Sequence, residues 1–175
     1  MKITDLKCAV IGDNPVIRIA TDEGIYGLGQ AEASKSYLKP HVLFYKNYLL
    51  GEDPTDVERV MQRIRRLGSF KPWGSAVSAI EMALWDIAGK AAGVPVCKLL
   101  GGSVRDAVPM IAYLFWRYDR PGGGDDECAE DLADWCVELH ETLGVNAMKL
   151  KAGVMDPMEE ARVLELCRER LGGDF

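Results

Sequence analysis

Short apolar runs separated by turn-forming residues make up the beginning of the chain. Apolar residues alternate with polar or small ones over residues 6–10, and further apolar runs follow at 16–19 and 25–29. Gly, Asp, Asn, Glu and Pro fill the intervening residues 12–15 and 22–24. A period of two is typical of strands, and links this short join neighbouring strands in antiparallel pairs. The pattern predicts a three-stranded antiparallel meander.

Helical spacing replaces this alternation after about residue 35. We expect one helix over residues 36–49, a second that begins at Pro54-Thr55, and a third over residues 76–92 that stops at Gly93. In the second and third segments apolar residues recur at intervals of three and four, which places them on one side of a helix. Strands followed by helices indicate a small α+β domain. We assign this domain to residues 1–102.

The order of elements changes after the third helix. Residues 108–115 form an apolar run suited to a buried strand, and residues 121–124 read as a glycine-rich loop. Asp125 or Asp126 is placed to cap a helix that ends at Gly144, where a glycine can adopt the left-handed conformation.

A second strand and helix follow. Residues 145–151 predict a strand, and Asp156 and Pro157 supply an N-cap and a proline at the first helical position of the next helix. Strand, helix, strand and helix joined by short links are typical of a parallel sheet or barrel. We therefore assign residues 103–175 to the start of a parallel βα sheet or barrel. The alternation breaks off there, so the sheet or barrel is expected to be incomplete in this chain.

Two lysines in the second of these strands are the candidate catalytic residues. Positions two apart share a face of a strand, so Lys149 and Lys151 point the same way. Met148 and Leu150 point the other way, toward covering helices, which turns the lysines to the interior at the C-terminal end of the strand, where barrel enzymes place their active sites. Two ammonium groups about 7 Å apart repel each other, which lowers the pKa of a lysine toward that of a useful base. The alternative is an edge strand whose lysines face water and discourage aggregation.

Charge and cysteine usage exclude several classes of protein. The 175 residues carry a formal net charge of −6, which argues against binding to nucleic acid because phosphates call for a basic surface. No apolar run approaches the roughly 18 residues of a membrane span, and we expect no secretory leader, because a strand-like segment follows Met1 directly. The five cysteines include no CxxC pair and sit in apolar stretches. We expect reduced, structural thiols and a cytoplasmic protein.

Residues 76–102 carry the most specific signal in the chain. The stretches AVSAIEMALWDIAGK and GVPVCKLLGG resemble, over more than twenty positions in register, the junction of capping domain and barrel in the mandelate racemase/muconate-lactonizing enzyme family of the enolase superfamily. Residues 22–32 resemble the second hairpin of the same family. The resemblance extends over essentially the whole chain. It implies an N-terminal capping domain in residues 1–102, followed in residues 103–175 by the first βα units of a TIM-type (β/α) barrel. For Glu81 and Asp86, which lie in this stretch, a structural role is favoured over acid–base work.

The resemblance also implies roles for four residues. The stretch Lys149-Leu150-Lys151 is similar to the Lys-x-Lys motif on the second barrel strand of the family. Lys151 would be the general base that removes the proton α to a carboxylate, and Lys149 would contact that carboxylate and lower the pKa of its neighbour. Tyr113, at the end of the first barrel strand, would touch substrate; the alternative is a buried aromatic residue with a hydrogen-bonded hydroxyl. Asn14 would belong to a capping-domain loop that closes the site.

An acid-sugar dehydratase is the function that the resemblance favours. Residues 113–115 and 149–154 are most similar to glucarate dehydratase and its relatives, which implies Mg²⁺-dependent proton abstraction and an enediolate intermediate. The resemblance implies that the metal ligands, three carboxylates on later strands, and the opposing acid or base would lie beyond Phe175. His41 and His140 are expected to be surface or packing residues and do not replace them. The expected partner is a small-molecule carboxylate, an acid sugar, and a homo-oligomer is expected, with no nucleic-acid or membrane partner.

Two other interpretations stay open. A racemase or cycloisomerase of the same family would use the same pair of lysines. A protein of another class would be a non-catalytic truncated fragment or a self-associating domain, because two strands cannot close an eight-stranded barrel and exposed edges favour association. The 175-residue chain alone is expected to be inactive, since its metal ligands are expected outside it.

Overall fold

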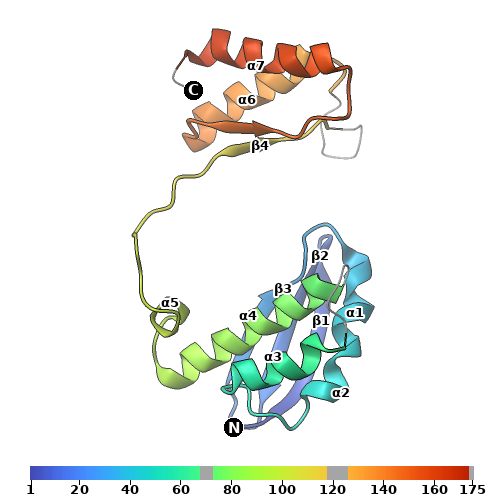
Figure 1. The fold of residues 1–175 in the computed structure, drawn as a ribbon, viewed down its shortest axis with the longest axis vertical. Helices are drawn as coiled ribbons and strands as arrows, with labels where there is room; N and C mark the ends of the chain where they lie inside the picture. Colours follow the sequence, from blue (N-terminus) through green and yellow to red (C-terminus); the bar gives the residue numbers. More distant parts are fainter. Residues whose placement is uncertain (68–72, 118–125, 174–175) are drawn as a thin grey trace. The chain divides into compact units, whose positions relative to one another are not determined.

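The structure, a computed structural model, describes residues 1–67, 73–117 and 126–173 (Figure 1). The chain divides into two compact units, Met1–Val104 and Arg105–Phe175, each with a hydrophobic core of its own. The glycine-rich loop expected at residues 121–124 and the candidate cap Asp125 lie outside the described residues.

A three-stranded antiparallel sheet forms one layer of the first unit, as the apolar alternation predicted. Its strands follow one another in space in chain order: β1 Ile3–Ile11, β2 Asn14–Thr21 and β3 Tyr26–Gln30. The first turn is tighter than expected, because only Gly12 and Asp13 separate β1 from β2. Gly12 has a φ of 59°, the left-handed conformation that a two-residue hairpin turn requires and glycine tolerates. Asn14, expected in the turn, is instead the first residue of β2 and pairs with Ile11.

Helices form the second layer of this unit. They are η1 Ser36–Leu38, α1 Lys39–Phe44, α2 Lys46–Leu49, α3 Val57–Arg65, α4 Trp73–Ala92 and α5 Val96–Leu99. The long helix α4 packs on β2 and β3, while α1 and α2 pack on β1 (Figure 1). The single helix expected over residues 36–49 is broken into three pieces. Pro40 lies in the first turn of α1, where a proline can begin a helix but cannot continue one.

Two glycines allow α4 to approach β3 closely. Gly27 and Gly29 stand on the face of β3 that meets α4. A Cβ atom at Gly27 would overlap the carbonyl oxygen of Ala83, and one at Gly29 would overlap the carbonyl oxygen of Ala79. The backbones of strand and helix are therefore in direct contact, and the core closes around them with these fully buried side chains: Tyr45, Ile3, Leu6, Ile17, Ile19, Leu38, Leu49, Met61, Ile64, Ile80, Leu84 and Ile87.

The acidic residues of α4 fasten it to its neighbours. The carboxylate of Asp86 accepts hydrogen bonds from the backbone nitrogen of Leu28, at 2.9 Å, and from Lys90 Nζ, at 2.7 Å. The carboxylate of Glu81 accepts one from Arg65 of α3, at 2.9 Å. These contacts agree with the structural role favoured for both acids.

The second unit has the expected order of strand, helix, strand and helix. Strands β4 Ala112–Leu114 and β5 Met148–Leu150 pair in parallel. Helices α6 Ala129–Leu143 and α7 Pro157–Leu171 pack against each other over the sheet (Figure 1). This is the arrangement from which (β/α) barrels are built. Strand β4 is shorter than the predicted 108–115, because Val108, Met110 and Ile111 lie outside the paired segment and are 66%, 72% and 51% exposed.

The ends of α6 and α7 test the capping rules. Gly144 ends α6 with a φ of 66°, as predicted, and the side chain of Asp156 accepts from the backbone nitrogen of Met158 at the start of α7, at 2.9 Å. The predicted cap of α6 was wrong: Cys128 is its N-cap residue, and the carboxylate of Asp131 accepts from the Cys128 backbone nitrogen at 3.1 Å. Asp126 is engaged elsewhere, with Arg117.

Candidate functional site

The two candidate lysines lie on the face of the β4–β5 pair that is turned away from the helices. Leu114 of β4 and Met148 of β5 point to the opposite face and pack into the core beneath α6 and α7. Lys149 and Lys151 are exposed, and on β4 the register places Tyr113 directly opposite Lys149. The period of two thus puts lysines and aromatic residues on one face and apolar residues on the other.

An aromatic pair lies beside Lys149 on this face. The Nζ atom of Lys149 is 4.9 Å from the centroid of the Tyr113 ring, within the range of a cation–π contact. The rings of Tyr113 and Phe115 are 4.3 Å apart between centroids and tilted by 45°. Tyr113 is 39% exposed, and its contact with substrate stays a prediction. The face therefore offers an ammonium group and a phenol side by side.

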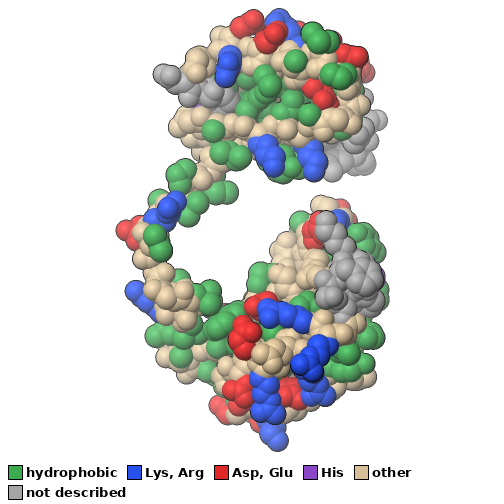
Figure 2. All heavy atoms as spheres, viewed as in Figure 1, with side chains coloured by type: hydrophobic (Ala, Val, Ile, Leu, Met, Phe, Trp, Pro, Cys, Tyr) green, Lys and Arg blue, Asp and Glu red, His purple; other side chains and the backbone are tan. Residues whose placement is uncertain are grey.

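The backbone of Lys151 is held at the end of both strands. Its nitrogen donates to the carbonyl oxygen of Leu114 at 2.9 Å, which continues the parallel pairing one residue past β5. Figure 2 shows acidic and basic side chains mixed over the first unit, whereas Lys or Arg side chains stand beside hydrophobic ones on the side of the second unit that carries β4 and β5. A face with these properties suits an anionic small molecule with apolar carbon atoms.

Asn14 belongs to the first unit. Its side-chain oxygen accepts from the backbone nitrogen of Ser34 at 3.0 Å, and Ser34 has a φ of 57°. This bond ties the start of β2 to the segment that follows β3. Contact of Asn14 with substrate stays a prediction.

A buried ion pair next to β4 was missed from the sequence. The Asp126 carboxylate is fully buried and accepts from the backbone nitrogen and from Nη2 of Arg117, both at 2.6 Å. Hydrogen bonding to Asp126 is the largest cause of the raised pKa of Arg117, whose guanidinium also lies 4.5 Å from the centroid of the Trp135 ring. The pair joins the end of β4 to the approach to α6.

A second buried acid was also missed. Glu160 of α7 is 7% exposed, and its carboxylate accepts from the backbone nitrogens of Gly153, Val154 and Met155. These hydrogen bonds lower the pKa of Glu160. The sequence does contain a signal for this contact: Gly153 comes just after the lysine motif, and Glu160 follows inside a helix with a predicted N-cap.

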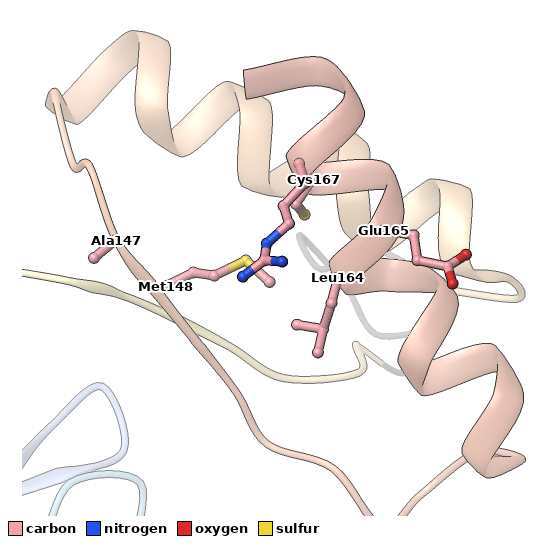
Figure 3. A pocket seen from close by; sticks show the side chains of 6 residues that line it. Ala147, Met148, Leu164, Glu165 and Cys167 are labelled. Carbon is pink, nitrogen blue, oxygen red and sulfur yellow. The ribbon is translucent and has the colours of Figure 1, made fainter. Parts of the chain in front are cut away.

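One apolar hollow of this unit lies away from the lysines. A hollow of about 390 Å³ lies between β5 and α7, lined by Ala147, Met148, Leu164, Glu165, Cys167 and Arg168. The side chains of Met148, Leu164 and Cys167 converge there (Figure 3). Because Met148 alternates with Lys149 along β5, the hollow lies on the opposite face of the strand from the lysines.

Three of the five cysteines behave as packing residues. All five are free thiols, and Cys8, Cys136 and Cys167 are buried. Burial raises the pKa of Cys136 to about 12 and also raises that of Cys167. Thiols that stay protonated are poor nucleophiles and poor metal ligands.

Metal ligands are not gathered in the part of the chain that the structure describes. Within residues 1–67, 73–117 and 126–173, no three His, Cys, Asp or Glu side chains come together to hold a metal ion. His41 Nδ1 lies 3.2 Å from the Tyr37 carbonyl oxygen, and His140 Nδ1 lies 2.7 Å from that of Val145. The described residues therefore do not fit a Mg²⁺ site. No helix in these ranges is both long and apolar enough to cross a membrane.

Comparison with known proteins places this geometry in a family. The N-terminal domain of the mandelate racemase/muconate lactonizing enzymes matches residues 12–101. A D-galactonate dehydratase family member from Marinomonas sp. (strain MWYL1) is 36% identical over 166 residues, which are 88% of this chain and 38% of that protein. The chain thus spans well under half the length of this relative.

Two solved structures share the fold over nearly the whole chain. The 3,6-anhydro-D-galactonate cycloisomerase from Zobellia galactanivorans superimposes with a TM-score of 0.79 at 25% identity, covering 100% of this chain and 49% of that one. An enolase from Thermobispora bispora DSM 43833, complexed with magnesium and formate, superimposes with a TM-score of 0.78 at 27% identity, covering 97% and 50%. The sheet and helices of the first unit are thus a capping domain of the enolase superfamily, and the chain belongs to the mandelate racemase/muconate lactonizing enzyme family.

Proposed function

We propose that this chain supplies the proton-abstracting face of an acid-sugar dehydratase. The observation that carries the proposal is the common exposed face of Lys149 and Lys151, with the Tyr113 ring beside Lys149. The dehydratase family relative from Marinomonas supports the class of substrate. An anionic acid sugar suits a face that combines ammonium groups with aromatic surface.

Lys151 acts as the general base in this proposal. Its neutral amine takes the proton from the carbon α to the substrate carboxylate, and the electron pair of the broken C–H bond moves into the carboxylate as an enediolate. The ammonium of Lys149 lies beside that carboxylate and stabilises the added negative charge. The hydroxyl on the β-carbon then leaves with its bonding electrons and, with a proton from an acid outside the described residues, becomes water. The enol that remains tautomerises to a 2-keto-3-deoxy acid.

Magnesium belongs to the proposal for the full-length enzyme only. When bound, Mg²⁺ would polarise the substrate carboxylate and make the α-proton more acidic. The magnesium complex of the Thermobispora relative supports this choice of metal. Its ligands would come from residues outside this sequence, so the steps described for this chain use the lysines alone.

A cycloisomerase is the second candidate. The Zobellia relative favours it, because an enediolate formed by the same lysines can expel an internal oxygen instead of a hydroxyl group. A racemase would return the proton to the other side of the α-carbon. The product distinguishes these outcomes: loss of water marks a dehydratase, and unchanged mass marks an isomerase.

The test uses the full-length protein, obtained by reading the gene past the codon for Phe175. Hexonate and hexarate sugars are incubated with it and Mg²⁺ in D₂O, and products are followed by mass spectrometry and proton NMR. We expect a product that has lost one water and has gained one deuterium from the solvent. Absence of both α-proton exchange and dehydration across the panel contradicts the proposal.

Two properties of the isolated chain also stay predictions. The 175-residue chain is predicted to be inactive by itself and to self-associate. The exchange assay and analytical ultracentrifugation of this chain check them directly. Exchange at the rate of the full-length enzyme contradicts the first prediction, and a monomer at all concentrations contradicts the second.

A further inference from the structure

The geometry points to Glu160 as a positioning residue for Lys151, an inference that rests on the proposed role of Lys151 as base. Glu160 lies one turn inside α7, and its carboxylate turns back toward the loop that follows β5. Its oxygens accept from Gly153 N at 2.8 Å, from Val154 N at 2.9 Å and from Met155 N at 3.1 Å. Three successive backbone N–H groups therefore converge on one buried carboxylate, an arrangement that binds anions strongly.

This carboxylate is not needed to cap the helix. Asp156 already caps α7 by accepting from Met158 N, and Pro157 fills the first helical position without a donor to satisfy. The N–H groups that Glu160 binds precede the helix. Its hydrogen bonds therefore fix the conformation of the loop, while Asp156 fixes the start of α7.

The loop is fastened on both sides of the Lys151 side chain. Before it, the Lys151 nitrogen donates to the Leu114 carbonyl oxygen at 2.9 Å, and two residues later Gly153 is held by Glu160. Gly153 has a φ of 100°, a conformation that residues with a Cβ avoid. The backbone from which Lys151 projects thus has little freedom, and we infer that Glu160 sets the direction of its amine.

Trp116 follows β4 and lies close to the same carboxylate. Its side chain is 5% exposed, and its Nε1 atom has no hydrogen-bond partner of normal geometry among the described residues. Its N–H nevertheless contributes, after the three backbone groups, to the lowered pKa of Glu160. Glu160 therefore lies where the segments that follow β4 and β5 come together.

The test compares Glu160→Gln and Glu160→Asp with a matched control, Glu169→Gln, which changes an exposed acid on the same helix. In the full-length enzyme, kcat and KM for α-proton exchange are measured per folded molecule. We expect Glu160→Gln to lower kcat by about 10- to 100-fold, the size of effect that a misplaced catalytic group produces, with KM changed less than about twofold. Glu160→Asp should restore part of kcat, and Glu169→Gln should match the parent. A kcat per folded molecule that Glu160→Gln leaves intact, with only stability reduced, overturns the inference.

A second readout separates this inference from the proposed function. In the 175-residue chain, amide hydrogen exchange of Gly153, Val154 and Met155 and the NMR signal of the Lys151 ε-methylene are compared for the same variants. If the parent enzyme exchanges no α-proton, the proposed function fails; faster amide exchange and a shifted Lys151 signal in Glu160→Gln still support the positioning role. If neither the amides nor the lysine signal changes, the positioning role fails, whatever the activity.

Discussion

The ammonium group of Lys149 lies over the ring of Tyr113, 4.9 Å from its centroid, because the parallel register places the two residues opposite each other on β4 and β5. The Lys149 side chain is exposed. A contact of this kind contributes about 0.5–1 kcal/mol at an exposed site. The lysine that is proposed to meet the substrate carboxylate is thus partly oriented before substrate arrives.

Replacing Tyr113 tests this contact. We expect Tyr113→Phe to keep kcat/KM within about twofold and Tyr113→Ala to lower it by about two- to fivefold, the factor that corresponds to loss of a cation–π contact. The measurement is the rate of α-proton exchange in the full-length protein. A loss in Tyr113→Phe as large as that in Tyr113→Ala would show that the hydroxyl group, not the ring, is what matters.

The contact of α4 with β3 predicts a strong effect of a single methyl group. Gly27→Ala places a Cβ against the carbonyl oxygen of Ala83, and we expect the first unit to lose about 3 kcal/mol of unfolding free energy through overpacking. Gly74→Ala is the control, since Gly74 lies in α4 with open space around it. This variant should leave the unfolding free energy unchanged or raise it by up to about 1 kcal/mol. Urea unfolding followed by NMR signals of the first unit gives both values. Equal stabilities of the two variants would contradict the close packing.

Capping rules predicted the helix ends that depend on neighbouring residues of the chain. Gly144 and Asp156 end and begin their helices as expected, because a left-handed glycine and an N-cap act within a few residues of the chain. The wrong cap at Asp126 has a distant cause, since its carboxylate is taken by Arg117, nine residues away. Likewise, the spacing of Gly27 and Gly29 says nothing of Ala83, which contacts them only after the sheet and helix have packed.

The ion pair of Arg117 and Asp126 should contribute measurably to the stability of the second unit. Asp126→Asn removes the charge that faces a partly buried guanidinium, and we expect a loss of about 2 kcal/mol of unfolding free energy. Asp134→Asn is the matched control, because Asp134 is 73% exposed in its pair with Arg170. This variant should lose no more than about 0.5 kcal/mol of unfolding free energy. Urea unfolding followed by signals of α6 compares them. An Asp126→Asn variant as stable as the control would contradict the account of this pair.

Acid should weaken the second unit through Asp131. Its carboxylate accepts from the Cys128 thiol and from the backbone nitrogens of Cys128 and Glu127, which lowers its pKa in the folded state. A carboxylate with a lowered folded pKa adds stability above its unfolded pKa of about 4, and that stability is lost as the pH falls through the folded value. Asp131→Asn should therefore flatten the fall of the urea midpoint with pH below about 4. A fall as steep as that of the parent would contradict this assignment.

The candidate site was predictable only in part, for a related reason. Strand periodicity predicts that Lys149 and Lys151 share one face of the strand, because that relation is set within a few residues. The pairing of Lys149 with Tyr113 depends on the register between β4 and β5, and the contact of Glu160 with the loop after Lys151 depends on how α7 folds back. Neither relation leaves a periodic signal in the sequence.

The most direct test of the central claim is α-proton exchange by the Lys151→Ala variant of the full-length protein in D₂O. Lys98→Ala, which changes an exposed lysine of the first unit, is the control. If Lys151 is the base, exchange falls by at least about 100-fold, the contribution typical of a general base, while the control keeps the parent rate. Exchange that continues at the parent rate in Lys151→Ala would contradict the assignment and return the lysine pair to the role of a solvated strand face.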